Sequence, residues 1–323
     1  MIRALVLAVG LLSVSVAGAS AQDFSAETLK ARDQLVAGDP AGKAALERLA
    51  VAGDSGAQVI VGGAQFVGAG GFPQDKAKAC QLWRAAAPAR ADAAHLDAEC
   101  VQMGHDGSKP DPARARTLFQ AAADRGSAKS KCALGNLLIA GQGGPADPKR
   151  GVALCREGAE AGDRDAQTDL GNFYLMGRNV ARDPVEARAW YEKAAAQGQA
   201  NAALTLGQIY WNGDGVAKDN TKAAALWRVA YAKGRLDADE HLAGEALVRA
   251  MADKSRVDWA AVDEAIAWYQ QALARDPSLR GKLGEPLDLM LKLKAARSEP
   301  RVGSGLPKSD GGVTFEETKG SGR

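Results

Sequence analysis

The sequence predicts an all-α protein built from stacked helical hairpins. Apolar residues recur at helical spacing through most of the chain, and the same residue types return every 36 residues, as from Tyr191 to Trp227. Apolar residues make up 46% of the chain but aromatic residues only 5%, so the core must consist largely of alanine and leucine. Alanine-rich helices with glycine between them are typical of closely packed repeats.

The stretch 202–234 shows the pattern of one hairpin most clearly. Leu206, Ile209 and Tyr210 have the spacing of an apolar helix face, and the turn residues 212–215 predict its end. Asp219 is suited to cap a second helix, because its carboxylate can accept the free N–H groups of the first turn. That second helix is expected to end at Gly234.

The hairpin recurs in register, counted back in steps of 36 residues. The predicted caps are Asp219, Asp183, Asp147, Asp111 and Asp75. Another column holds Trp227, Tyr191, Cys155, Phe119 and Trp83, whose aromatic members we interpret as core. A first-helix glycine recurs as Gly207, Gly171 and Gly135, and the same count places Glu99 in that column.

The two most regular units, LGQIYWNGDGVAKDNTKAAALWRVAYAKG and LGNFYLMGRNVARDPVEARAWYEKAAAQG, closely resemble the Sel1-like repeat. The resemblance extends over about residues 55–234. It implies a right-handed α-solenoid, similar to arrays of tetratricopeptide repeats, in which first helices line a concave groove. Relatives commonly act as adaptors for other proteins.

The N-terminal residues 1–21 have the pattern of a signal peptide. Arg3 precedes the apolar run Ala4–Val16, and Ala19, Ser20 and Ala21 fit the small-x-small cleavage rule. The alternative is an uncleaved membrane anchor. With the resemblance, this pattern indicates an exported bacterial protein, periplasmic or secreted, without stable membrane insertion after cleavage.

The rest of the chain divides into four predicted parts. We expect an N-terminal helical cap at 22–54, five repeats at 55–234, a divergent repeat with capping helices at 235–297, and a disordered tail at 298–323. Within 235–297 the helical patterns cover 236–252, 258–275 and 279–296.

All four cysteines lie in the first three repeats, and an even number in an exported chain predicts disulfides. Four cysteines allow three pairings. Adjacency in the stack favours Cys80–Cys100 and Cys132–Cys155. Four buried thiols are the alternative.

The composition argues against several classes of function. The formal net charge is only +2, so there is no electrostatic case for nucleic-acid binding. The cysteines lack zinc-finger spacing, and we interpret His95 and Glu99 as a solvated pair rather than a metal site. We therefore expect no metal and no cofactor. The motifs S-x-x-K and K-T-G are absent from the sequence, and no other catalytic constellation is recognisable.

A row of carboxamides is the predicted partner-binding site. Asn136, Asn172 and Gln208 each follow the first-helix glycine, and carboxamides can both donate to and accept from a peptide backbone. We expect this position to turn each side chain away from the second helix of its own hairpin. Trp211 and Asn212 lie beside the row, and Trp211 is a candidate anchor. The alternative is a solvated polar face.

These observations favour a non-enzymatic exported scaffold that binds a protein or peptide through its concave face. A cell-envelope enzyme, such as a β-lactam hydrolase or a peptidoglycan-active protein, is the second hypothesis. Binding through the convex face or the tail is a third.

Overall fold

The computed structural model describes residues 24–253 and 256–298, and all regular structure in these two ranges is helical. This confirms the predicted fold class. The expected signal peptide and the tail lie outside the described residues, apart from Ser298, which ends the last helix. Within the described ranges, no helix combines the length and the apolar character that crossing a membrane requires. The chain divides into two compact units, Met1–Gln197 and Gly198–Arg323.

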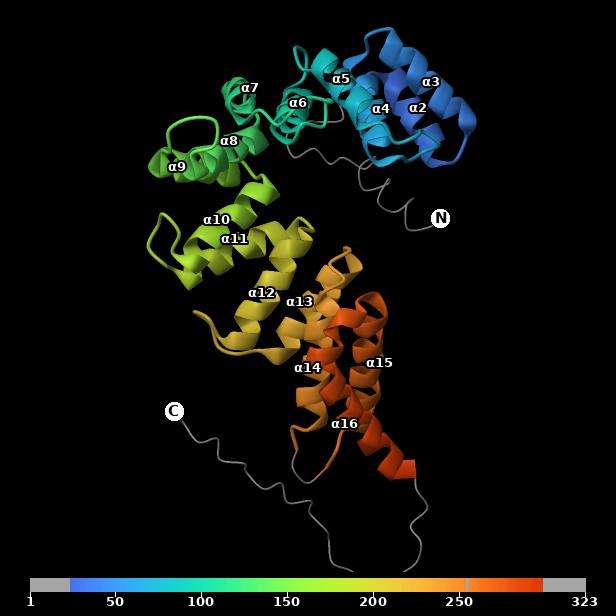
Figure 1. Ribbon diagram of the computed structural model, residues 1–323, viewed down its shortest axis with the longest axis vertical. Helices are drawn as coiled ribbons and strands as arrows, with labels where there is room; N and C mark the ends of the chain where they lie inside the picture. Colours follow the sequence, from blue (N-terminus) through green and yellow to red (C-terminus); the bar gives the residue numbers. More distant parts are fainter. Residues whose placement is uncertain (1–23, 254–255, 299–323) are drawn as a thin grey trace, which may run out of the picture. The chain divides into compact units, whose positions relative to one another are not determined.

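The first unit is a series of five antiparallel helix pairs, in which each helix packs on the next (Figure 1). Its helices are α2 (Ala26–Val36), α3 (Pro40–Val51), α4 (Ser55–Val67), α5 (Lys76–Ala86), α6 (Ala91–Met103), α7 (Pro112–Asp124), α8 (Ala128–Ala140), α9 (Pro148–Glu160), α10 (Arg164–Met176) and α11 (Pro184–Ala196).

The second unit contains two further pairs, α12/α13 and α14/α15, and a last helix that packs on α15. Its helices are α12 (Ala200–Asn212), α13 (Asn220–Ala232), α14 (Ala238–Ala250), α15 (Trp259–Arg275), the 3₁₀ turn η2 (Pro277–Leu279) and α16 (Arg280–Ser298). Leu283, Leu287 and Met290 of α16 are buried in one core with residues of α14 and α15.

Aspartates cap the second helix of every repeat, as the sequence predicts. The side chain of each residue accepts a hydrogen bond from a backbone N–H in the first turn of the helix that follows it. These caps are Asp75, Asp111, Asp147, Asp183 and Asp219.

First helices end in turns where the backbone must adopt a positive φ. Gly68 (φ 73°) and Gly141 (φ 65°) occupy the left-handed position after α4 and α8, which glycine adopts without steric cost. Both begin glycine-rich loops between paired helices, residues 68–71 and 141–144. Their role in the structure is that of a turn.

The aromatic column is core, as predicted. Trp83, Phe119, Tyr191 and Trp227 are all buried, with at most 5% of the residue exposed. Each ring lies on a second helix and fills the space beside the first helix of the same pair. Alanines on both helices complete these cores.

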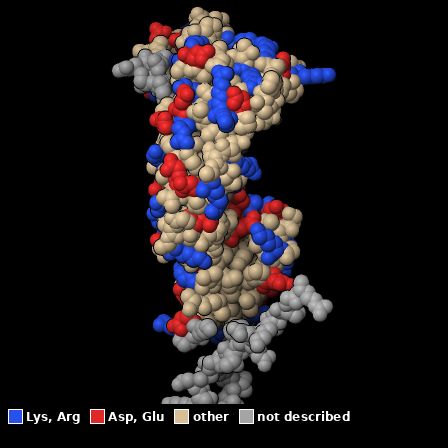
Figure 2. Space-filling model, turned by 90° about the vertical axis from the view of Figure 1, so that its left-hand side faces the viewer, with Lys and Arg blue, Asp and Glu red and all other residues tan. Residues whose placement is uncertain are grey.

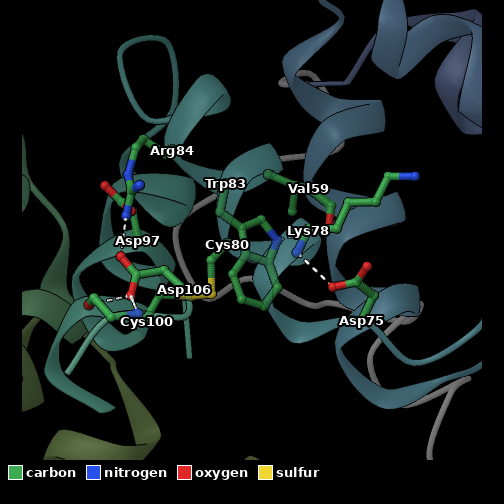
Figure 3. The surroundings of a disulfide bond; sticks show 10 residues. Val59, Asp75, Lys78, Cys80, Trp83, Arg84, Asp97, Cys100 and Asp106 are labelled. Carbon is green, nitrogen blue, oxygen red and sulfur yellow. Dashed lines mark hydrogen bonds and ion pairs between the residues drawn. A yellow bond between two sulfur atoms is a disulfide. The ribbon is translucent and has the colours of Figure 1, made fainter. Parts of the chain in front are cut away.

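Two disulfides join helices of the first unit, in the pairing that adjacency favours. Cys80–Cys100 links α5 to α6, with Cα atoms 5.9 Å apart, and Cys132–Cys155 links α8 to α9. Beside the first bond, Arg84 binds two carboxylates (Figure 3): its Nε lies 3.0 Å from Asp97 Oδ1 and its Nη2 lies 2.8 Å from Asp106 Oδ2. The Arg84–Asp97 ion pair and the disulfide therefore connect the same two helices, and the Arg84–Asp106 pair ties α5 to the loop after α6.

Candidate binding site

A pocket of about 220 Å³ opens between the first helices of three successive pairs, α6, α8 and α10. It lies wholly within the first unit. Its lining is formed by His95, Glu99, Lys129, Cys132, Ala133, Asn136, Asp163, Asp165, Ala166 and Asp169.

The helix register explains why these residues meet, and it corrects the predicted column. The loop from Gly104 to Asp111 is one residue longer than the loop from Gly141 to Asp147, so α8 begins 37 residues after α6. Ala98, which is fully buried, therefore occupies the first-helix glycine position of this repeat. The assignment of Glu99 to that position was wrong, and Glu99 instead matches Asn136.

Two aspartates of α10 are held in place at the pocket. Asn136 Nδ2 donates a hydrogen bond to Asp169 Oδ2 at 2.8 Å, across from α8. Asp163 caps α10 and accepts from the N–H of Ala166 at 2.7 Å. Burial raises the pKa of both Asp163 and Asp169, although these hydrogen bonds oppose the shift. A cation beside them would favour their charged forms.

His95 is only 3% exposed, so the interpretation of His95 and Glu99 as a solvated pair was wrong. Its ring lies 5.4 Å from that of Phe119, and its Nδ1 is 3.0 Å from Ser130 Oγ. Its Nε2 lies 3.2 Å from Glu99 Oε1. The repeat pattern does not reveal the contact with Ser130, because Ser130 lies on α8, in the next pair along the stack.

Carboxylates outnumber basic groups around the pocket. Burial would raise the pKa of Glu99, but His95 and Lys129 outweigh it and the pKa is lowered. Lys129 Nζ lies 3.7 Å from Asp165 Oδ2, so it offsets part of the negative charge. The four carboxylates Glu99, Asp163, Asp165 and Asp169 thus face one lysine and one histidine. Such a lining is suited to bind a positively charged group.

On the face drawn in Figure 2, basic and acidic side chains are interspersed rather than gathered into one large field. Among the described residues, no group of three or more His, Cys, Asp or Glu side chains is placed to hold a metal ion.

Of the predicted site residues, Asn136 is exposed and lines the pocket, whereas Asn172 points elsewhere. The Tyr191 hydroxyl donates to Asn172 Oδ1 at 2.7 Å, and Tyr191 lies on α11, the second helix of the same pair. The expectation that the carboxamides turn away from their own second helix was therefore wrong for Asn172.

The other three predicted residues lie together in the second unit. Gln208 Nε2 donates to Asn212 Oδ1 at 2.9 Å. The Trp211 ring lies 5.6 Å from that of the buried Trp227, so it packs at the edge of the core. This contact shows that the core uses part of the Trp211 ring, whereas its role as an anchor for a partner stays a prediction.

The sequence did not single out Asp163, Asp165 and Asp169 as site residues. A signal existed: Lys129 and Asp165 are 36 residues apart and begin their helices at equivalent positions. This repeat position therefore holds a charged residue in both α8 and α10. Only packing shows that they border one pocket.

Comparison with known proteins identifies the repeat. The family model described as Sel1 repeat matches residues 55–87, 91–127, 128–163, 164–199, 200–234 and 262–277. No match was found among curated proteins. The fold is similar to that of a Sel1 repeat protein from Oxalobacter formigenes, with 23% identity and a TM-score of 0.63 over 77% of this chain and 100% of that chain.

A second similar structure is c5321, a protective antigen present in uropathogenic Escherichia coli strains that displays an SLR fold. Its identity is 22% and its TM-score 0.52, over 75% of this chain and 52% of that chain. At these identities the solved structures show the fold alone. The family model covers more than half of the sequence, and the chain therefore belongs to the Sel1 repeat family.

Proposed function

We propose that this protein is an exported, non-enzymatic scaffold that binds a segment of a protein partner on the face formed by its first helices. The observation that carries the proposal is the pocket between α6, α8 and α10, which opens on that face. Sel1 repeats generally mediate protein–protein interaction, which supports a binding role. The proposal assigns no catalytic role to any residue.

Export is supported by the signal-like residues 1–21 and by the two disulfides. Disulfides persist in oxidising compartments such as the bacterial periplasm and are rare in the cytosol. Cell fractionation of the full-length protein, with detection of the mature chain, tests this part. Retention of an uncleaved chain in the cytosol would contradict it.

Site-directed photocrosslinking tests which face binds. A photoreactive amino acid would be placed at Asn136, which is exposed on α8, and separately at Ala153, which is exposed on α9, the second helix of the same pair. We expect a discrete crosslinked partner from Asn136 and none from Ala153, in cells that export the protein. Crosslinks from Ala153 alone would assign binding to the opposite face.

A further inference from the structure

We propose that the exposed face of α16 pairs with the same face of a second copy of this chain. The two helices would run antiparallel about a two-fold axis beside Leu289, with Glu285 of each copy next to Lys292 of the other. This inference goes beyond the proposed function and does not depend on it. The helix α16 lies in the second unit, whereas the pocket between α6, α8 and α10 lies in the first.

The first observation is that α16 carries more apolar side chains than its own core uses. Leu283, Leu287 and Met290 are buried in one core with residues of α14 and α15. Leu289 and Leu291 are instead 45% and 40% exposed. The end of a repeat array normally presents a polar outer face, which keeps the array soluble. Single exposed leucines are nevertheless common on protein surfaces, so their neighbours must indicate what they contact.

The neighbours of Leu289 form one continuous stripe along the helix. Glu285, Leu289, Lys292 and Ala296 are spaced by four, three and four residues, which places them on one side of an α-helix. All four residues are exposed. The apolar centre of the stripe therefore has a negative group toward the start of α16 and a positive group toward its end.

The two charged members of this stripe are available for an external partner. Elsewhere on α16, Lys294 Nζ lies 2.6 Å from Asp263 Oδ1 of α15. Glu285 and Lys292, in contrast, form no ion pair within residues 24–253 and 256–298. A partner that covers Leu289 would best place a cation beside Glu285 and an anion beside Lys292.

A second copy of α16 offers this arrangement when it runs in the opposite direction. With Leu289 opposite itself, Glu285 of one helix lies within one residue of Lys292 of the other, or about 1.5 Å along the helix axis. The two-fold axis repeats the contact, so both ends of the stripe are matched at once. A parallel pair would instead bring like charges together. The charges thus determine the direction of pairing, and the leucines supply the apolar contact.

The size of the contact predicts a weak dimer. A stable complex usually buries about 800 Å² on each partner, and the face of one helix offers less. We therefore expect a dissociation constant on the order of 10–100 μM.

Sedimentation velocity of the mature, oxidised protein over about 1–500 μM measures this equilibrium. We expect a monomer at the lowest concentration and mainly a dimer at the highest. A chain that stays monomeric throughout would overturn the inference. Self-association that appears only after deletion of residues 299–323 would also overturn it, and would assign the face to the chain's own C-terminal segment.

Charge reversal tests which face pairs and in which direction. Glu285→Lys and Lys292→Glu each place like charges at both symmetric contacts, so each variant alone should dimerise about tenfold or more weakly. An equimolar mixture of the two variants should restore the dimer, because each lysine then meets a glutamate of the other variant. Such restoration also shows that both variants fold.

Glu160→Lys is the matched control for Glu285→Lys. Glu160 is exposed at the end of α9, and its replacement makes the same change in net charge away from α16. We expect the dissociation constant of this variant to stay within about twofold of that of the unaltered chain. Equal losses in Glu160→Lys and Glu285→Lys, undiminished dimers in both stripe variants, or a mixture that stays monomeric would each overturn the inference.

Discussion

At the scale of single residues, a helical glycine of the first helix lies directly against a tryptophan ring of the second helix in two of the pairs. A Cβ atom on Gly62 would lie 2.5 Å from Trp83 Nε1, and one on Gly207 would lie 2.4 Å from Trp227 Nε1. The Trp227 indole cannot move away freely, because it is buried and donates to the Leu204 carbonyl at 3.2 Å. The glycine of the first helix and the aromatic ring of the second helix therefore pack directly against each other in these pairs.

We predict that Gly207→Ala destabilises the second unit although alanine favours helices. Overpacking against Trp227 should cost about 1–3 kcal/mol, which exceeds the roughly 1 kcal/mol gained in helix propensity. Gly244→Ala on α14 is the control, since a Cβ there meets nothing within 4 Å. It should raise the free energy of unfolding by up to about 1 kcal/mol. Urea titration measures both, and equal changes would refute the contact argument.

A second prediction concerns His241, whose ring stacks on Trp227 at 4.9 Å. Burial lowers its pKa below 6.5, although Glu240 and Asp237 oppose the shift. Below pH 6.5 the unfolded chain therefore binds a proton more readily than the folded chain. The contribution of neutral His241 to the free energy of unfolding is complete above that pH, and it decreases as the pH falls toward the pKa of His241 in the folded chain. His241→Phe keeps an aromatic ring but should show a smaller decrease in urea midpoint between about pH 7.5 and 5.5.

Residue positions could be predicted where a repeat column determines the environment. The capping aspartates and the buried rings are such cases, since their neighbours lie in the same pair. The carboxamides are not. Asn172 pairs with Tyr191 and Asn136 pairs with Asp169, so one repeat position has two different partners. The 36-residue period predicts the position of a residue on its helix, but it does not predict which neighbouring side chain that residue contacts.

At the scale of elements, helix positions followed from local signals. The pattern at 258–275 predicted α15, which spans Trp259–Arg275 with Asp258 as its cap. The pattern at 279–296 predicted α16, which spans Arg280–Ser298. Caps and turn residues act within a few positions, so they can be recognised without knowledge of packing.

The register of the first helices was harder to predict than their existence. One extra residue between Gly104 and Asp111 shifts α6 against a strict count of 36, which misplaced Glu99. Counting forward from each capping aspartate and from each loop glycine separately would have shown the insertion. The pocket could not be predicted in the same way, because it depends on how α6, α8 and α10 pack.

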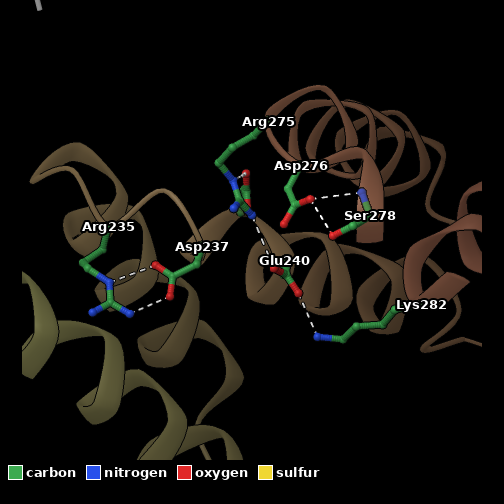
Figure 4. A network of polar contacts seen from close by, with 8 residues as sticks. Arg235, Asp237, Glu240, Arg275, Asp276, Ser278 and Lys282 are labelled. Atoms are coloured by element: carbon green, nitrogen blue, oxygen red, sulfur yellow. Dashed lines mark hydrogen bonds and ion pairs between the residues drawn. The ribbon is translucent and has the colours of Figure 1, made fainter. Parts of the chain in front are cut away.

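At the scale of the whole molecule, ion pairs join helices in both units, whereas both disulfides lie in the first unit. The second unit has a network of charged side chains that joins α14 to the end of α15 and the start of α16 (Figure 4). Arg275 binds both oxygens of Asp239, at 2.9 and 3.1 Å, and Asp239 is fully buried. Lys282 Nζ lies 2.7 Å from Glu240 Oε2. Removing Arg275 would leave the buried Asp239 carboxylate without this compensating charge.

The first unit instead contains every cysteine of the chain, in two disulfides with sequence separations of 20 and 23 residues. Each disulfide that closes a loop of this length stabilises a protein by about 3 kcal/mol, because it restricts the unfolded chain. In a repeat array, stability is approximately a sum over repeats and their nearest neighbours. The loss on reduction should therefore be greatest near α5, α6, α8 and α9 and smallest at the end of the second unit.

Hydrogen exchange with peptide-level mass spectrometry measures this distribution directly. Reduction and alkylation of the mature protein should increase exchange in α5–α9 by up to about a hundredfold, since local opening becomes about 3 kcal/mol less costly there. Peptides from α14–α16, which contain no cysteine, should exchange at an unchanged rate. A double substitution of Cys80 and Cys100 by alanine is the matched test, because it leaves Cys132–Cys155 intact and should affect α5 and α6 most. A uniform increase along the whole chain, α14–α16 included, would show instead that both units open in one cooperative step.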